Sequence, residues 1–281
     1  MKGTRLSTAT VITPCRNAQD LVGRTAQSVM SQTAVRSGRL RLQYLICDGA
    51  SRDGTRDVVR RICGDAAEIV SEPDTSMYHA LAKGFRRAEG DIVSYLNAGD
   101  VYAPTALDVV ADVFEQHDVE WITGLAVQEN NRRQVISAHL PNRYRARLLR
   151  KGLYGTRLVP WYLQQESTFW LRRLVSLVDL QRLATFRLAG DSYLWSCFAR
   201  ESEPVIVESH LGAFAHHDNQ LSTDVQGYHD ELRRKVREAP NAADLVLALF
   251  DRAEGLAPLR VRKKLNPRGL LLFYFEADGW R

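Results

Sequence analysis

The chain has 281 residues, of which 45% are apolar and 25% charged, which suits one large globular domain or a domain with an extension. No stretch approaches the roughly 18 apolar residues of a membrane span. The first apolar run stops before Pro14 and is too short for a secretory signal peptide. The four cysteines are scattered, which argues against a zinc site or a disulfide framework. We therefore expect a cytoplasmic protein with reduced thiols.

The net charge of +5 is concentrated in two segments without acids, residues 141–157 and 260–268. Such patches attract phosphates, anionic lipid or nucleic acid, or they are simply solvated faces. Nucleic acid is the least favoured of these partners because no recognition motif accompanies the basic residues.

Short strand-like and helical segments alternate through the first hundred residues. The predicted strands are 10–13, 42–47, 68–70 and 92–96, and the predicted helices are 18–31, 54–63 and 76–88. This alternation predicts an α/β fold with a mostly parallel sheet. Further along, we expect strands at 121–127 and 134–139, a helix at 191–199 and a strand at 205–207. From residue 224 the chain is helical and charged, and it ends in the apolar run 270–275.

Polar loops follow all four of the early strands. They are Pro14–Asn17, Asp48–Thr55, Ser71–Asp74 and Asn97–Asp100. One such loop would be an ordinary turn. Since ligands of parallel sheets bind beyond the carboxyl ends of the strands, four together predict one shared ligand site.

Several ordered motifs make residues 8–223 resemble the family 2 glycosyltransferases. They are V-I-T-P-C-R-N (11–17), I-C-D-G-A-S-R-D-G-T (46–55), S-E-P-D-T-S-M-Y-H-A-L-A-K-G (71–84), Y-L-N-A-G-D (95–100), Q-E-S-T-F-W (165–170), L-A-G-D-S-Y-L-W (188–195) and H-H-D-N-Q-L-S (216–222). The resemblance implies the glycosyltransferase A fold, a Rossmann-like central sheet flanked by helices, here with a helical C-terminal extension. It divides the chain into a nucleotide-sugar-binding half (1–100), an acceptor-binding half (101–223) and a basic and apolar extension (224–281).

The resemblance also implies a donor site and a divalent metal ion, Mn²⁺ or Mg²⁺. Such ions take oxygen ligands and stabilise the charge that develops on a nucleoside diphosphate leaving group. Asp100 is the expected principal ligand, and His216 or His217 a further one. The expected donor-binding residues are Pro14, Arg16, Asn17, Asp48, Asp53, Asp74, Lys83, Asn97 and Gly99. Asp53 has a competing role as a turn and helix-capping residue, and Lys83 could equally be a solvated helix lysine.

Inverting transfer requires a base that removes the proton of the acceptor hydroxyl. Asp191 resembles the base of the family, although it could instead only cap the helix that it begins. Glu166 is the second candidate, as a base or as an acceptor ligand. We expect Phe169, Trp170 and Trp195 in the core rather than stacked on sugars.

This sequence departs from the motifs at three positions. Ala82 stands where asparagine is usual, close to the donor. His79 and Asn97 stand where acids are usual, and these two keep a non-catalytic nucleotide-sugar-binding or scaffold protein as the alternative. A nucleotidyltransferase would be expected to have a glycine-rich phosphate loop near residue 15, which is absent.

The expected donor is a UDP-sugar, and the expected acceptor is a glycan or a polyprenyl-linked sugar of bacterial polysaccharide or glycolipid synthesis. Residues 258–275 place basic residues before an apolar run, an order that suits peripheral contact with the inner face of the membrane. The same segment could instead dock on the chain's own core or on a second subunit of a homodimer.

Overall fold

The computed structural model describes residues 6–217, 220–274 and 279–281. The four strands predicted in the first hundred residues are present as β1 (Thr8–Cys15), β2 (Arg41–Asp48), β3 (Ala67–Ser71) and β4 (Ile92–Tyr95). The three predicted helices contain α1 (Val22–Met30), α3 (Thr55–Cys63) and α4 (Met77–Arg87), and a short α2 (Thr33–Arg36) precedes β2. The alternation of apolar patterns therefore located each of the main elements in this half.

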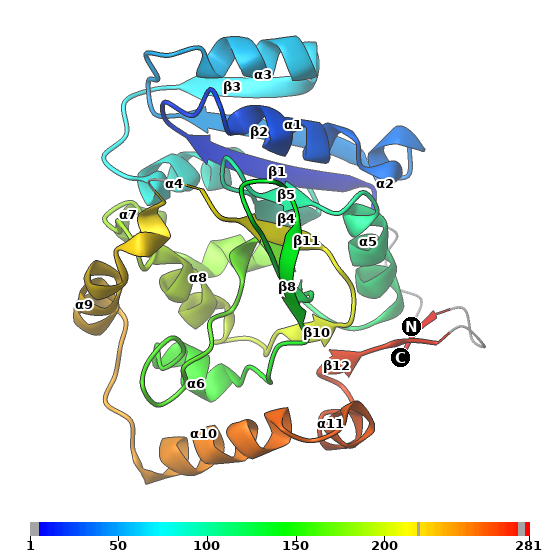
Figure 1. The fold of residues 1–281 in the computed structure, drawn as a ribbon, viewed down its shortest axis with the longest axis vertical. Helices are drawn as coiled ribbons and strands as arrows, with labels where there is room; N and C mark the ends of the chain where they lie inside the picture. Colours follow the sequence, from blue (N-terminus) through cyan, green and yellow to red (C-terminus); the bar gives the residue numbers. More distant parts are fainter. Residues whose placement is uncertain (1–5, 218–219, 275–278) are drawn as a thin grey trace.

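The central sheet has eight strands in the order β12-β10-β6-β9-β4-β1-β2-β3 (Figure 1). Its further members are β6 (Trp121–Thr123), β9 (Thr168–Leu171), β10 (Val205–Val207) and β12 (Leu270–Leu271). All described pairings are parallel except those of β9, which runs antiparallel to both β4 and β6. This arrangement confirms the predicted α/β fold with a mostly parallel sheet.

Helices cover both faces of the sheet. Successive side chains of β1 point to opposite faces, and on each face they pack into a buried cluster with helices. Val11 packs with α1, α3 and α5 (Ala106–Gln116). Ile12 faces the other way, toward α4, α6 (Ala146–Arg150), α7 (Leu180–Leu183) and α8 (Gly190–Phe198). Strands buried on both faces are typical of parallel sheets.

A second, four-stranded sheet has the order β5-β11-β7-β8. It contains β5 (Val101–Tyr102), β7 (Ala126–Glu129), β8 (Val135–His139) and β11 (Gly212–Ala215). The predicted hairpin around Asn130 is formed by β7 and β8. The single strand predicted at 121–127 is instead divided at Gly124, where a Cβ would lie 2.7 Å from the Ser209 carbonyl oxygen. The chain leaves the central sheet there and enters the second one.

The C-terminal segment is helical in α9 (Val225–Lys235), α10 (Ala242–Gly255) and α11 (Leu259–Leu265), and then becomes extended. The apolar run that begins at Leu270 contributes β12 to the edge of the central sheet, where Leu270 and Leu271 are buried. β13 (Phe273–Tyr274) pairs with β14 (Gly279–Trp280). The start of this run therefore docks on the chain's own core, one of the two alternatives predicted for it. Phe275, its last residue, lies outside the described residues.

Candidate functional site

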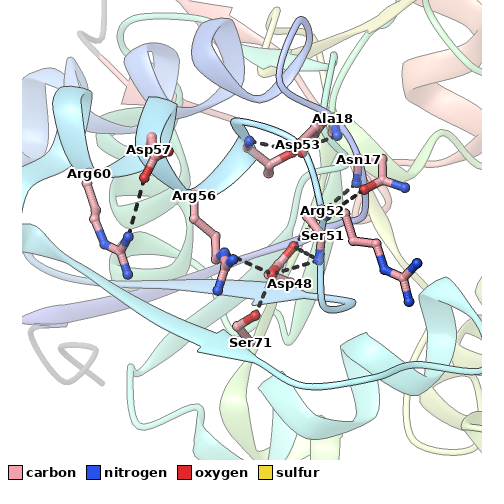
Figure 2. A network of polar contacts seen from close by, with 11 residues as sticks. Asn17, Ala18, Asp48, Ser51, Arg52, Asp53, Arg56, Asp57, Arg60 and Ser71 are labelled. Carbon is pink, nitrogen blue, oxygen red and sulfur yellow. Dashed lines mark hydrogen bonds and ion pairs between the residues drawn. The ribbon is translucent and has the colours of Figure 1, made fainter.

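Asp48, at the end of β2, lies in a dense set of polar contacts (Figure 2). Its carboxylate accepts hydrogen bonds from the Ser51 backbone N–H and hydroxyl and from the Ser71 hydroxyl, the last at 2.6 Å. The Arg56 guanidinium lies 3.9 Å away. The side chain of Asp48 is buried, so these contacts fix its position and draw the ends of β2 and β3 together.

Asn17 and Asp53 connect the loops that follow β1 and β2. The Asn17 amide oxygen accepts from the Arg52 N–H at 2.9 Å, and the Asn17 N–H donates to the Ser51 hydroxyl. Asp53 accepts from the backbone and hydroxyl of Thr55, the first residue of α3, and from the Gln19 N–H. Burial would raise the pKa of Asp53, but the hydrogen bonds from Thr55 outweigh it and lower that pKa. Asp53 thus has the turn-forming and helix-capping contacts weighed for it in the sequence.

Arg16 and Asp74 meet over Gly49, between the ends of β1 and β2. A Cβ on Gly49 would lie 3.2 Å from both the Arg16 side chain and an Asp74 carboxylate oxygen, so both side chains lie close against this glycine. Lys83 of α4 is largely buried and lies 2.5 Å from the other Asp74 oxygen. It is therefore not a solvated lysine. Pro14 is buried in β1 directly before this loop.

The loop after β4 buries Asp100 beside the second sheet. Asp100 accepts from the Ala215 N–H of β11 at 2.9 Å, and Gly99 adopts a positive φ of 110°. The Thr25 hydroxyl of α1 contacts both residues: it donates to the Asp100 carbonyl and accepts from the Gly99 N–H. Helix α1 and strand β11 together fix the Asp100 carboxyl.

Asp100 and Glu166 form a buried acidic pair. Burial raises the pKa of Asp100 to about 7, against the opposing effect of the Ala215 N–H and Arg24. Burial, and next the charge of Asp100, raise the pKa of Glu166 well above its usual range. Among the described residues, the buried Oε1 of Glu166 and Oδ1 of Asn97 have no hydrogen-bond partner. Two carboxyls and an unpaired amide oxygen are hard oxygen ligands that a divalent cation would satisfy.

The two candidate histidines differ in position. His217 lies against Gly99, where a Cβ would be 3.3 Å from its ring, so it is next to the Asp100 loop. His216 is exposed and its ring contacts the Gln128 side chain at 3.1 Å. Within residues 6–217, 220–274 and 279–281, no group of three or more histidine, cysteine or acidic side chains is arranged to hold a metal. The fit to a cation therefore rests on Asp100, Glu166 and the Asn97 oxygen, with His217 adjacent.

Asp191 lies in a small cavity at the start of α8, lined also by Tyr154, Tyr162, Trp195 and Tyr228. Its carboxylate accepts from the Ser192 N–H at 2.7 Å and from the Tyr228 hydroxyl at 3.3 Å. Burial raises its pKa to about 6, in spite of these hydrogen bonds. The residue at the N-cap position is Ala189, so Asp191 is inside the helix, and its raised pKa suits a base near neutral pH.

Tyr78 joins the two halves of the site. A Cβ on Gly190 would lie 2.4 Å from the Tyr78 ring, so α8 begins in direct contact with α4. The Tyr78 hydroxyl donates to the Leu188 carbonyl at 3.1 Å. Burial, and next the charge of Asp191, raise the pKa of Tyr78, which places the two side chains near one another. The predicted base therefore adjoins the helix that carries Lys83.

Helix α9 contributes two residues that the sequence motifs did not indicate. Tyr228 donates to Asp191, and Glu231 accepts from the N–H groups of residues 187–189, immediately before α8. Both lie beyond the boundary predicted at residue 223, so part of the extension reaches the site. A carboxylate on a charged helix carries no local signal of such a contact. Phe169, Trp170 and Trp195 are buried, which confirms their expected place in the core.

Known proteins resemble this chain in sequence and in fold. Residues 10–173 match the model of the family described as "Glycosyl transferase family 2". An uncharacterized glycosyltransferase of Mycobacterium tuberculosis (strain H37Rv) is 29% identical over 218 residues, which cover 75% of this chain and 76% of that protein. A second uncharacterized glycosyltransferase, from Nostoc sp., is 29% identical over 101 residues, 35% of this chain and 30% of its own.

Two solved structures share the fold. TarS (residues 1–349) of S. aureus, crystallised with UDP-GlcNAc, has a TM-score of 0.62 at 12% identity, covering 93% of this chain and 79% of its own. The mannosyltransferase PcManGT of Pyrobaculum calidifontis, in complex with GDP-Man and Mn²⁺, has a TM-score of 0.53 at 21% identity, covering 92% and 78%. At these low identities the two likenesses concern the fold alone.

Proposed function

Because this chain belongs to glycosyl transferase family 2 and is a glycosyltransferase of the glycosyltransferase A fold, we propose that it is a metal-dependent, inverting enzyme. It transfers a sugar from a nucleotide-sugar donor, most simply a UDP-sugar, to a hydroxyl of a glycan or polyprenyl-linked acceptor. The observation that carries this proposal is the placement of the buried Asp100–Glu166 pair at the strand ends and of Asp191 in its cavity.

The donor is proposed to bind across the ends of β1, β2 and β4. In this proposal Asp48, which Ser51 and Ser71 hold in place, accepts a hydrogen bond from the nucleotide base, and Arg16 contacts phosphate. TarS was crystallised with UDP-GlcNAc and PcManGT with GDP-Man, so both bases are represented among proteins of this fold. Lys83 acts on the donor through Asp74, which it orients.

Asp100, Glu166 and Asn97 would hold the divalent ion, with His217 beside them. The bound ion would supply positive charge to the diphosphate as the sugar leaves. The protein itself excludes water from the carboxyls and holds Asp100 through Ala215. In this assignment Glu166 binds metal, and the base is Asp191.

Asp191 is proposed to accept the proton of the acceptor hydroxyl as that oxygen forms the new bond to the anomeric carbon. The bond from this carbon to the diphosphate breaks, and the diphosphate departs with the electron pair. Tyr228 donates to the carboxylate and so favours its ionised, proton-accepting form. Attack opposite the leaving group inverts the anomeric centre.

A thermal-shift panel tests the proposal directly. UDP-, GDP-, dTDP- and CMP-sugars are each added with Mn²⁺, Mg²⁺ or EDTA to the wild type, to Asp100→Asn and to the exposed control Asp65→Asn. A ligand at about 100 times its Kd adds about 2.7 kcal/mol of stability. One nucleotide class should stabilise wild type and Asp65→Asn only with metal, and Asp100→Asn should lose the effect. Binding without any sugar release or transfer would favour the scaffold alternative, and no binding by folded protein would reject the donor site.

A further inference from the structure

Helix α10 is packed with its polar face inward. Asp244, Asp251 and Glu254 are buried against the body of the protein, together with Ala248. Four apolar side chains on the opposite side are exposed: Leu245, Val246, Leu249 and Phe250, with Val246 65% and Leu249 63% exposed. A surface helix normally shows the reverse arrangement, with its apolar stripe against the core. Something other than the burial of apolar surface must therefore hold α10 in this orientation.

Ion pairs with the segment around α6 provide that hold. Arg147 and Lys151 lie 2.5 and 2.7 Å from the two oxygens of Asp244, and Arg145 lies 2.6 Å from Asp251. An Asn241 capping box fixes the first turn of α10. Three basic residues of the patch predicted at 141–157 are therefore already paired with acids of α10. Leaving a buried carboxylate without its partner is costly, so the inward face of the helix is strongly specified.

Further exposed apolar side chains follow in the next turn and in α11. Leu256 is 90% exposed, and Val261 and Leu265 are also exposed. The acids of residues 241–268 are the three buried in α10, so no acid is exposed on this surface. Exposed basic residues border it instead: Arg252, Arg260, Lys264 and Arg268. We call this surface, residues 245–268 of α10, α11 and the turn after them, the α10–α11 face. It lies along the outer edge of the molecule, below α6 in Figure 1.

We propose that the α10–α11 face docks on an anionic lipid bilayer, with the apolar side chains at the interface and the basic residues at the head groups. Apolar side chains rimmed by lysine and arginine are the composition of interfacial helices. A symmetric contact between two copies would bring the same basic residues together without an acid to pair them. Among the described residues no helix is long and apolar enough to cross a membrane.

This surface differs from the one predicted from the sequence at 258–275. Leu270 and Leu271 are buried in β12, whereas the exposed apolar residues begin well before residue 258, at Leu245. The face is also joined to the site, because Leu149 and Gly152 of the α6 segment line the Asp191 cavity. Arg147 and Lys151 of the same segment hold α10. The α6 segment thus contacts both the Asp191 cavity and the helix that carries the face.

Sedimentation of the full chain with vesicles tests the proposal. Vesicles of phosphatidylcholine alone are compared with vesicles that also contain phosphatidylglycerol, without donor or metal. Wild type should bind only the anionic vesicles. Val246→Glu with Leu249→Glu should abolish binding, because both positions are exposed and need not disturb folding. Val135→Glu with Ile136→Glu on β8 is the matched control, with similar exposure and the same charge change, and should bind as wild type does.

The charged rim is tested by Arg252→Gln, Arg260→Gln and Lys264→Gln. Each should weaken binding about fivefold, and the triple variant about a hundredfold. Circular dichroism and donor-induced thermal shifts of every variant, measured without vesicles, separate loss of docking from loss of fold or of donor binding. The proposal is wrong if wild type ignores anionic vesicles, or if the Val246/Leu249 variant still binds. It is also wrong if wild type is a dimer that this variant dissociates.

Discussion

Replacing Asp191 with asparagine should stabilise the protein while it removes transfer activity. Burial raises the pKa of this carboxyl from 3.8 to about 6, so the folded state disfavours the ionised form. Between these two pH values the unfolded chain has already lost the proton and the folded chain has kept it. The stability of the wild type therefore falls as the pH rises through this window and stays lower above pH 6.

A difference of roughly two pKa units corresponds to about 3 kcal/mol. Because Asp191 is partly exposed, we take this as an upper limit. The asparagine side chain of Asp191→Asn cannot ionise, so this variant should recover about 1–3 kcal/mol of unfolding free energy at pH 8, but little at pH 4. In the proposed mechanism the same change removes the proton acceptor, so it should lower kcat by about 10²–10⁴-fold. Wild-type activity should fall about tenfold for each pH unit below the pKa near 6.

Urea unfolding at pH 4 and pH 8, with transfer rates measured across the same range, checks both parts. Asp65→Asn, an exposed acid in the turn after α3, is the control and should change neither quantity. Tyr228→Phe should move the acidic limb of the rate profile upward by as much as about one unit, since it removes a hydrogen bond to the carboxylate. Equal stability of wild type and Asp191→Asn at pH 8, or an acidic limb that survives in the variant, would refute the reasoning.

Three further substitutions probe the rest of the site. Glu166→Gln should remove metal-dependent donor stabilisation in thermal shifts. It should nevertheless stabilise the metal-free protein at neutral pH, because it removes one of the two buried carboxyls that lie beside each other. A metal response like that of wild type would exclude Glu166 as a ligand. Gly190→Ala should cost about 1–3 kcal/mol, measured by chemical unfolding, because its Cβ would meet the Tyr78 ring at 2.4 Å; an unchanged midpoint would show that the two helices separate easily. Glu231→Gln weakens the hold on residues 187–189 and should lower kcat while the KM for donor stays near wild type; a change in donor KM alone would contradict this positioning role.

The fold of the first hundred residues was predictable because its signals are local. Strands buried on both faces read as apolar runs, and the turns that follow β1 to β4 need polar, turn-forming residues. Asp48 and Asp100 could therefore be placed at one edge of a sheet from the amino-acid sequence. The burial and the partners of each side chain could not be predicted. Lys83 pairs with Asp74 instead of remaining solvated, and this depends on how α4 packs beside β2.

The chain beyond residue 100 was harder to predict because its contacts join residues far apart in the sequence. Tyr228 and Glu231 reach the start of α8 from a helix that looks like a charged extension in the sequence. The strand predicted at 121–127 was also too long, because a single glycine, Gly124, moves the chain from one sheet to the other. A periodic pattern of apolar residues cannot reveal the close approach of Gly124 to the Ser209 backbone, because the two residues are far apart in the sequence.

Helix α10 shows why an amphipathic pattern alone does not give orientation. Periodicity separates a polar face from an apolar one, and the usual inference places the apolar face inward. Here the choice is reversed by partners about a hundred residues earlier in the chain: Arg145, Arg147 and Lys151 require the buried acids Asp244 and Asp251. If the helix turned over, Arg145, Arg147 and Lys151 would lose these partners. Retaining an exposed apolar stripe is unfavourable in water and favourable at a lipid surface, and this difference is the physical reason to seek a membrane beside α10.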